Sequence, residues 1–114
     1  MGSERSVDLT PEERELVRAL LAQHLPDTEV WAYGSRVKGT STPKSDLDLV
    51  AFATPDQAAA VGDLREAFEE SDLPFRVDLF VWDEVPESFR PRIEEDYAAI
   101  ATRRSTPRTP RSES

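Results

Sequence analysis

The apolar residues in the first third of the chain follow a helical and then a strand-like spacing. From residue 11 to residue 25 they recur every three or four positions, which predicts an amphipathic helix containing Leu16, Val17, Leu20, Leu21 and Leu25. Thr10, Pro11 and Glu13 are typical of a helix start, because they form a capping box with proline at the first helical position. Residues 29–33, EVWAY, then predict a short strand that ends at Gly34.

The same two spacings return in the rest of the chain. Residues 46–53 and residues 76–82 alternate between polar and apolar positions in the way of half-buried strands. Between them, Thr54 and Pro55 repeat the helix-start signal ahead of an apolar stripe formed by Val61, Leu64, Ala67 and Phe68. A last helix, beginning near Pro91, is expected from the spacing of Phe89, Ile93, Tyr97 and Ile100.

The predicted order of elements is helix, strand, loop, strand, helix, strand, helix. This order indicates a small α/β (α+β) sandwich, in which a mixed β-sheet is flanked by helices mainly on one side. With 114 residues the chain is expected to form one domain, residues 1–101, without room for a second, acceptor-binding domain. Residues 102–114 lack periodicity and predict a basic disordered tail.

Composition limits the kind of metal site and the compartment. The chain has no cysteine and one histidine, so thiolate and histidine-rich sites are excluded and any metal must be a hard cation held by oxygen. No apolar run approaches the roughly 18 to 20 residues of a membrane helix, and residues 1–8 lack a signal-peptide core. We therefore expect a cytoplasmic protein that does not associate with membranes.

Charge is distributed unevenly along the chain. The formal net charge is −9, but residues 103–114 hold four arginines and one glutamate, which leaves residues 1–102 with 10 basic and 22 acidic residues, or −12. Such a body should repel a nucleic-acid backbone, so no direct binding of nucleic acid is expected from it. A basic protein partner or a metal-bound anion suits it better. The tail either only adds solubility or contacts RNA or the acidic body of another copy.

Three aspartates lie in the predicted strands. Asp46 and Asp48 share one face of their strand, and Asp78 lies inside the next apolar strand. If these strands are neighbours, the three carboxylates converge and raise one another's pKa. One or two Mg²⁺ ions would offset this repulsion, because Mg²⁺ prefers oxygen ligands. An Asp-x-Asp pair alone is often merely solvated, so the third carboxylate matters to the interpretation.

A glycine-containing loop precedes the aspartates. Gly34 and Ser35 directly follow a predicted strand, where glycine lets the backbone approach a ligand and both amides can face an anion. Arg36 and Lys38 carry charges that match phosphate oxygens, although exposed basic residues in polar loops are usually only solvated. A phosphate-binding loop beside a carboxylate metal site indicates nucleoside triphosphate chemistry. The metals would bridge carboxylates and phosphates while the α-phosphate is attacked and pyrophosphate leaves.

The stretch 34-GSRVKGTSTPKSDLDL-49 resembles the G-S-x-x-G…S-D-x-D-L signature of the polymerase-β-like nucleotidyltransferases. The chain length is similar to that of their minimal members, the MNT proteins, and the resemblance extends over residues 9–100. It implies the polymerase-β-like fold, binding of the triphosphate by Gly34 and Ser35, and binding of Mg²⁺ by Asp46, Asp48 and Asp78.

The resemblance also implies an activity and a partner. Minimal nucleotidyltransferases are antitoxins that transfer AMP from ATP to a tyrosine of a HEPN-domain toxin, an RNase. Two alternatives stay open. In the first, the protein masks the HEPN partner by complex formation without catalysis. In the second, it modifies a small molecule in the manner of aminoglycoside nucleotidyltransferases, although those enzymes generally carry an extra acceptor domain.

Overall fold

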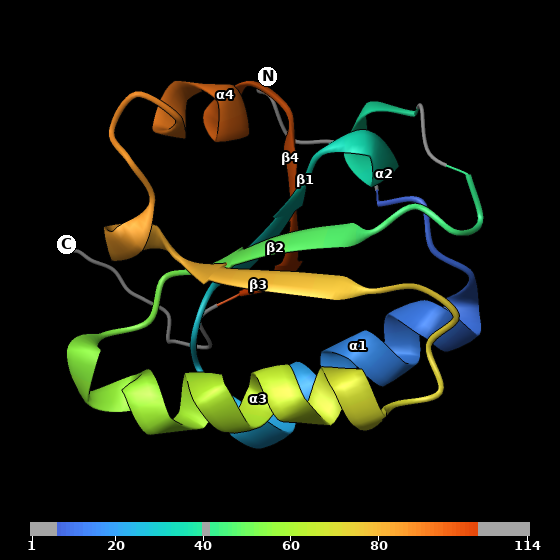
Figure 1. The fold of residues 1–114 in the computed structure, drawn as a ribbon, viewed down its shortest axis with the longest axis horizontal. Coiled ribbons are helices and arrows are strands. Elements are labelled where there is room, and N and C mark those ends of the chain that lie inside the picture. Colours follow the sequence, from blue (N-terminus) through green and yellow to red (C-terminus); the bar gives the residue numbers. More distant parts are fainter. Residues whose placement is uncertain (1–6, 40–41, 103–114) are drawn as a thin grey trace, which may run out of the picture.

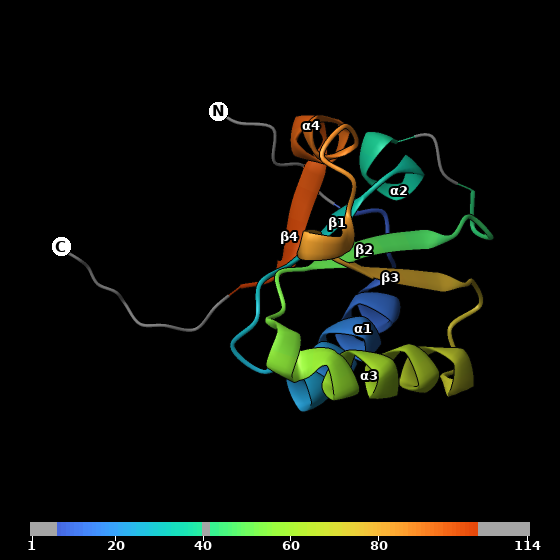
Figure 2. The same ribbon diagram turned by 60° about the vertical axis from the view of Figure 1, so that its left-hand side comes forward.

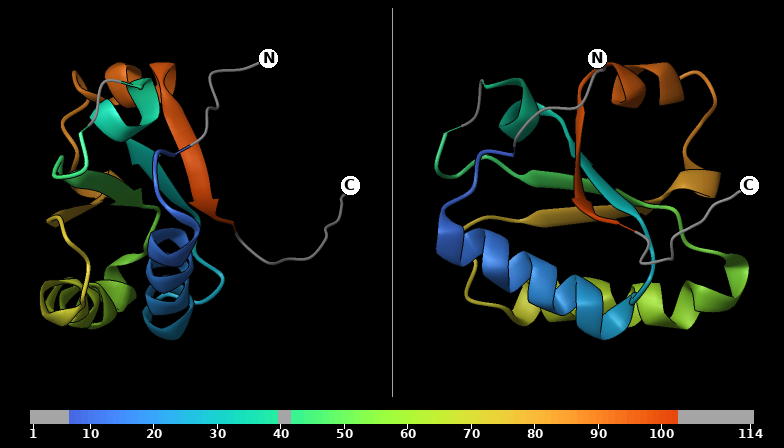
Figure 3. Two further views of the ribbon diagram at one scale, coloured as in Figure 1. Left: turned by 90° about the vertical axis from the view of Figure 1, so that its right-hand side faces the viewer. Right: turned by 180° about the vertical axis from the view of Figure 1, so that it is seen from behind.

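A four-stranded sheet with two long helices on one face forms the body of the molecule (Figures 1 and 3). The computed structural model describes residues 7–39 and 42–102. Its helices and strands are α1 Pro11–His24, β1 Val30–Tyr33, α2 Ser35–Lys38, β2 Leu47–Ala51, α3 Ala58–Glu70, β3 Val77–Val81, α4 Arg90–Glu95 and β4 Tyr97–Ala101. Short 3₁₀ turns, Pro55–Gln57 and Trp82–Glu84, precede α3 and follow β3.

The sheet is mixed, as the sequence predicts. Its strand order is β3-β2-β1-β4, with β2 parallel to β3 and β1 antiparallel to both of its neighbours. A parallel pair needs a crossover connection, and α3 supplies it between β2 and β3. The helices α2 and α4 lie on the side of the sheet away from α1 and α3 (Figures 1 and 2).

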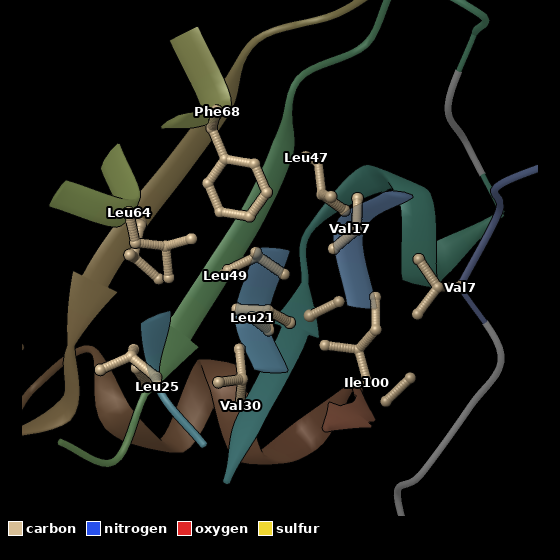
Figure 4. Packing of buried hydrophobic residues seen from close by; sticks show 14 of the residues in the cluster. Val7, Val17, Leu21, Leu25, Val30, Leu47, Leu49, Leu64, Phe68 and Ile100 are labelled. Carbon is tan, nitrogen blue, oxygen red and sulfur yellow. The ribbon is translucent and has the colours of Figure 1, made fainter. Parts of the chain in front are cut away.

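The main core lies between the sheet and the pair α1 and α3. Figure 4 shows Leu47 and Leu49 of β2 gathered with Leu21 of α1 and Leu64 of α3, and all four side chains are buried. Val50 belongs to a separate cluster on the other face. The predicted alternation along β2 is therefore confirmed, and the residues that alternate with Leu47 and Leu49 face away from the main core.

The helix starts follow their sequence signals closely. The Glu13 amide donates to the Thr10 hydroxyl at 3.1 Å, and the Thr10 amide donates to the Glu13 carboxylate at 3.0 Å. Ahead of α3, the Thr54 amide donates to the Gln57 side chain at 2.8 Å. Both capping boxes predicted from Thr-Pro sequences are thus confirmed, because caps depend on contacts within four residues.

The prediction of a last helix that includes Tyr97 and Ile100 is wrong. The helix α4 ends at Glu95, Asp96 has an extended backbone, and the next residues form strand β4. This strand pairs with β1, buries Ala98 and Ile100 in the main core, and stacks Tyr97 on Trp31 at 3.9 Å between ring centroids. Pairing with β1 therefore outweighs the helical spacing, and that long-range contact leaves no local signal.

Two further outcomes concern the ends and the connections. The four-residue helix α2 was not predicted, because the stretch after Gly34 has the composition of a polar loop. Residues 103–114, most of the predicted tail, lie outside the described residues. Within residues 7–39 and 42–102, every helix is too short or too polar to cross a lipid bilayer.

Candidate active site

Asp48 and Asp78 occupy paired positions on the parallel strands β2 and β3. Their register places the two Cα atoms directly opposite each other. The flanking residues Leu47, Leu49 and Leu79 are buried in the main core. Both carboxylates therefore lie on the face of the sheet away from α1 and α3, side by side, as the sequence predicts.

The turn at Gly34 lies against Asp48 of this pair. In the antiparallel pairing of β1 with β2, Tyr33 lies opposite Asp48, and Gly34 follows at the end of the strand. Gly34 has φ of +88°, a conformation that side chains of L-residues rarely adopt, and a β-carbon there would lie 2.5 Å from Asp48 Oδ2. Glycine is thus required for both the backbone and the space, and the Gly34-Ser35 turn sits against the Asp48 carboxylate.

Asp46 stands apart from the other two carboxylates. It is exposed and precedes β2 by one residue, yet its charge acts on Asp48. On the neighbouring strand, Asp78 Oδ1 accepts from Arg76 Nε at 3.2 Å, and the Arg76 side chain is 75% exposed. An ion pair so open to solvent contributes little to stability, so it does not hold Asp78 away from another cation.

The donor set suits a magnesium ion that also binds phosphate. Within the described residues, no three His, Cys, Asp or Glu side chains gather closely enough to make a metal cage from protein ligands alone. Mg²⁺ is usually held by one or two carboxylates, with substrate phosphates and water completing its six ligands. Asp48 and Asp78 supply two adjacent carboxylates of that kind, directly beside the Gly34 turn.

The electrostatics of this face favour a cation. Burial, followed by the negative charges of Asp78 and Asp46, raises the pKa of Asp48 from 3.8 to about 6. Burial, followed by the charges of Asp48 and Asp78, also raises the pKa of the Tyr33 hydroxyl. The pKa of Asp48 and that of Tyr33 thus both depend on neighbouring carboxylates. Clusters of groups with such shifted pKa values are common at functional sites.

Comparisons with known proteins assign the family. The nucleotidyltransferase domain model matches residues 13–101. The chain belongs to this nucleotidyltransferase family. It is 43% identical over 111 residues to the protein named probable protein adenylyltransferase MntA of Haemophilus influenzae. The aligned region covers 96% of this chain and 97% of that protein. Family membership makes the chain an enzyme of the nucleotidyl-transferring class, as its signature predicts.

Solved structures agree on the fold of this nucleotidyltransferase. A toxin–antitoxin crystallised with AMP-PNP is similar with a TM-score of 0.61 at 18% identity, covering 78% of this chain and 73% of that one. A mutant MntA–HpeT toxin–antitoxin is similar with a TM-score of 0.60 at 16% identity and the same coverage. At these identities the likeness concerns the fold, and it confirms the predicted nucleotidyltransferase architecture.

The Arg36 side chain of the nucleotidyltransferase has a different environment from the exposed one that its sequence position suggests. Its side chain is only 3% exposed. Nε donates to the Ser45 carbonyl at 2.9 Å, Nη1 to the Asp8 carbonyl at 2.7 Å and Nη2 to the Pro43 carbonyl at 2.9 Å. The guanidinium is thus occupied by main-chain oxygens. We revise the expected phosphate contact of Arg36, which no sequence signal distinguished from the exposed Lys38.

Aromatic residues cover much of the same face of the sheet. Trp31 stacks on Tyr97, and Trp82 stacks on Phe52 with ring centroids 4.9 Å apart, so both tryptophans pack against neighbouring rings. The sequence did not predict that the large apolar side chains of Phe80 and Phe89 are exposed. They are 45% and 39% exposed in the nucleotidyltransferase. The alternation along β3 places Phe80 on the face of Asp78 and was the available signal.

Proposed function

We propose that this nucleotidyltransferase transfers AMP from ATP to a HEPN-domain toxin protein and acts as its antitoxin. The observation that carries the proposal is the position of the Asp48 carboxylate, which lies against the Gly34 turn and beside Asp78. The similarity to a probable protein adenylyltransferase supports the acceptor class, and the AMP-PNP in a structural relative supports ATP. The toxin–antitoxin relatives support the partner.

In this proposal the carboxylates hold Mg²⁺ and the turn holds the triphosphate. Asp48 and Asp78 bind the metal from adjacent strands, and Asp46 joins them from the start of β2. When bound, Mg²⁺ neutralises charge on the phosphate oxygens and polarises the phosphoryl group. Gly34 and Ser35 bind the β- and γ-phosphates, because the backbone at Gly34 can approach a ligand without a side chain in the way.

The reaction forms one bond and breaks one. An acceptor hydroxyl oxygen bonds to the α-phosphorus, the bond between the α-phosphorus and the bridging oxygen to pyrophosphate breaks, and the hydroxyl proton leaves to a site carboxylate or to water. Asp78 orients the incoming hydroxyl. A groove along the outer edge of β3 is lined by Asp78 and Phe80 together with residues of α3, so it lies next to this part of the strand.

The direct experiment combines the chain with a folded HEPN partner, Mg²⁺ and ATP labelled at the α-phosphate. We expect label on the partner, reduced at least about a hundredfold by Asp48→Asn, because positioned charge contributes several kcal/mol to such transfers. Asp63→Asn is the matched control, since Asp63 is an exposed aspartate of α3. A partner that stays unlabelled by the wild-type protein would overturn the proposal.

One observation favours a second function, in which binding alone silences the partner. Residues 1–102 carry a charge of −12, which complements a basic protein such as an RNase. The double variant Asp46→Asn, Asp48→Asn separates the two functions, because it removes the proposed metal ligands while retaining most of the acidic surface. If this variant binds the toxin and still neutralises it in cells, occlusion suffices; if it binds without neutralising, AMP transfer is required.

A further inference from the structure

The buried guanidinium of Arg36 joins segments that are far apart in the sequence. It reaches the Asp8 carbonyl ahead of α1 and the carbonyls of Pro43 and Ser45 in the loop that leads to β2. Its carbon atom Cζ also lies 4.0 Å from the ring centroid of Phe75, which precedes β3. One side chain thus contacts the approaches to α1, β2 and β3.

The contact with Asp8 is reciprocal. While Arg36 Nη1 donates to the Asp8 carbonyl, the Asp8 amide donates to the Arg36 carbonyl at 2.8 Å. Val7, the preceding residue, is buried in the main core. Two hydrogen bonds and the burial of Val7 therefore fix the segment ahead of α1 against α2. This fixes the position of Arg36, whose other donors bind the loop before β2.

The loop that Arg36 holds is closed on itself. The Ser45 amide donates to the Thr42 carbonyl at 3.0 Å, and the Thr42 amide donates to Ser45 Oγ at 2.9 Å. Arg36 binds the carbonyls of this turn from inside. Since Ser45 is followed directly by Asp46, the place of the Asp46 backbone depends on the turn that Arg36 holds.

We propose that Arg36 is a positioning residue, which fixes the 42–45 turn against α2 and so sets Asp46 relative to Gly34 and Asp48. The inference rests on the proposed function of these aspartates as metal ligands. Gly34 and Arg36 belong to the same turn, so the phosphate-binding backbone and the first aspartate are tied to one guanidinium.

The geometry requires arginine. A planar guanidinium offers five donors in a fixed fork and packs on an aromatic ring, whereas a lysine ammonium is a point charge with three donors. Arg36→Lys keeps the charge but cannot reach the Asp8, Pro43 and Ser45 carbonyls while lying on Phe75. The variant therefore leaves some of these partly buried carbonyls without their donor, which loosens the turn.

The matched control is Arg65→Lys. Arg65 also donates two guanidinium hydrogen bonds to a main-chain oxygen, the Leu79 carbonyl, at 3.0 and 2.9 Å, and it does so at the outer edge of β3. Both variants lose bonds between a guanidinium and a carbonyl. Only Arg36→Lys should change the 42–45 turn. Phe75→Leu serves as a milder second variant, because it removes the ring under the guanidinium and leaves the carbonyl contacts in place.

Two readouts test the inference. Amide hydrogen exchange of residues 42–46, in the absence of Mg²⁺ and nucleotide, should quicken about tenfold in Arg36→Lys, less in Phe75→Leu, and not at all in Arg65→Lys. In calorimetric titrations with Mg²⁺ and a non-cleavable ATP analogue, the Mg²⁺ concentration at half-saturation should rise about fivefold or more in Arg36→Lys.

The outcomes are separable from those of the proposed function. Unchanged exchange at residues 42–46 in both Arg36→Lys and Phe75→Leu would overturn the positioning role, whatever the activity. Faster exchange with unchanged Mg²⁺ dependence would make Arg36 a purely structural residue and would also overturn it. Absence of AMP transfer by the wild-type protein would count against the proposed function alone, since both readouts are made without turnover.

Discussion

Gly34 and Asp48 are so close that a single added carbon would bring them into collision. A β-carbon on Gly34 would lie 2.5 Å from Asp48 Oδ2, although Gly34 follows β1 and Asp48 lies in β2. The contact joins the proposed phosphate-binding turn to the proposed metal ligand. Several expected outcomes depend on it and on the charges around it.

Gly34→Ala should lower the free energy of unfolding and remove nucleotide binding together. The backbone at φ +88° is unfavourable for alanine, and the new methyl group must displace the Asp48 carboxylate. Strain of this kind costs about 1–3 kcal/mol. Chemical denaturation measures the loss of stability, and calorimetry with Mg²⁺ and an ATP analogue measures binding.

Gly62→Ala is the control for that substitution. Gly62 lies in α3, where an added β-carbon would meet no atom within 4 Å. Alanine is favoured over glycine inside a helix by roughly 0.5–1 kcal/mol, so this variant should be more stable than the wild type and should bind nucleotide normally. Equal stability losses at the two glycines would contradict the proposed contact with Asp48.

Asp48→Asn should stabilise the metal-free protein at neutral pH. The pKa of Asp48 is raised from 3.8 to about 6 in the folded state, so between these values the folded protein binds more protons than the unfolded chain. Its contribution to stability is therefore lost as the pH rises through this window. After a discount for partial exposure, asparagine should add about 1–2 kcal/mol at pH 7.

The same substitution provides its own pH control. Below about pH 4, Asp48 is protonated in both states, so the advantage of asparagine should disappear. Urea denaturation of both proteins from pH 4 to pH 8 measures the difference. An advantage that is constant over this range would show that the charge of Asp48 does not oppose folding.

Mg²⁺ should stabilise the wild-type protein against thermal unfolding. At a Mg²⁺ concentration ten times its dissociation constant, linkage gives about 1.4 kcal/mol, or several degrees for a domain of this size. Asp48→Asn should lose this response, whereas Asp63→Asn should keep it, because Asp63 lies on the exposed side of α3. A response to Mg²⁺ that Asp48→Asn retains in full would exclude Asp48 as a ligand.

Ile100→Ala tests the strand that replaced the predicted last helix. Ile100 is 3% exposed and belongs to the main core, so its truncation should lower the free energy of unfolding by about 2–4 kcal/mol. Thr102→Ala, two residues further and exposed, should change it by less than about 0.5 kcal/mol. Similar values for both variants would argue against the packing of β4.

Local signals in the sequence were enough for most of the fold. The capping box of Thr10 and Glu13 depends on neighbouring residues, and the alternation of Leu47, Asp48 and Leu49 depends only on the strand geometry. Strand β4 could not be predicted from local signals, because pairing with β1 and packing in the core determine the positions of Tyr97 and Ile100.

In the candidate site too, features set by local sequence could be predicted, whereas features set by long-range contacts could not. The adjacency of Asp48 and Asp78 followed from their positions in two strands once those strands were neighbours. The burial of Arg36 did not follow, since it depends on carbonyls contributed by Asp8 and by the loop before β2. The close approach of Gly34 to Asp48 likewise requires the register of β1 and β2.

The proposed function is AMP transfer to a partner protein from a site built on Asp48. Mass spectrometry of a HEPN-domain partner, after incubation with the wild-type chain, ATP and Mg²⁺, tests it most directly. We expect a mass increase of one or more adenylyl groups on the partner, absent with Asp48→Asn and present with Asp63→Asn. A folded partner that binds the chain and gains no adenylyl group, or gains it equally with Asp48→Asn, would contradict the claim.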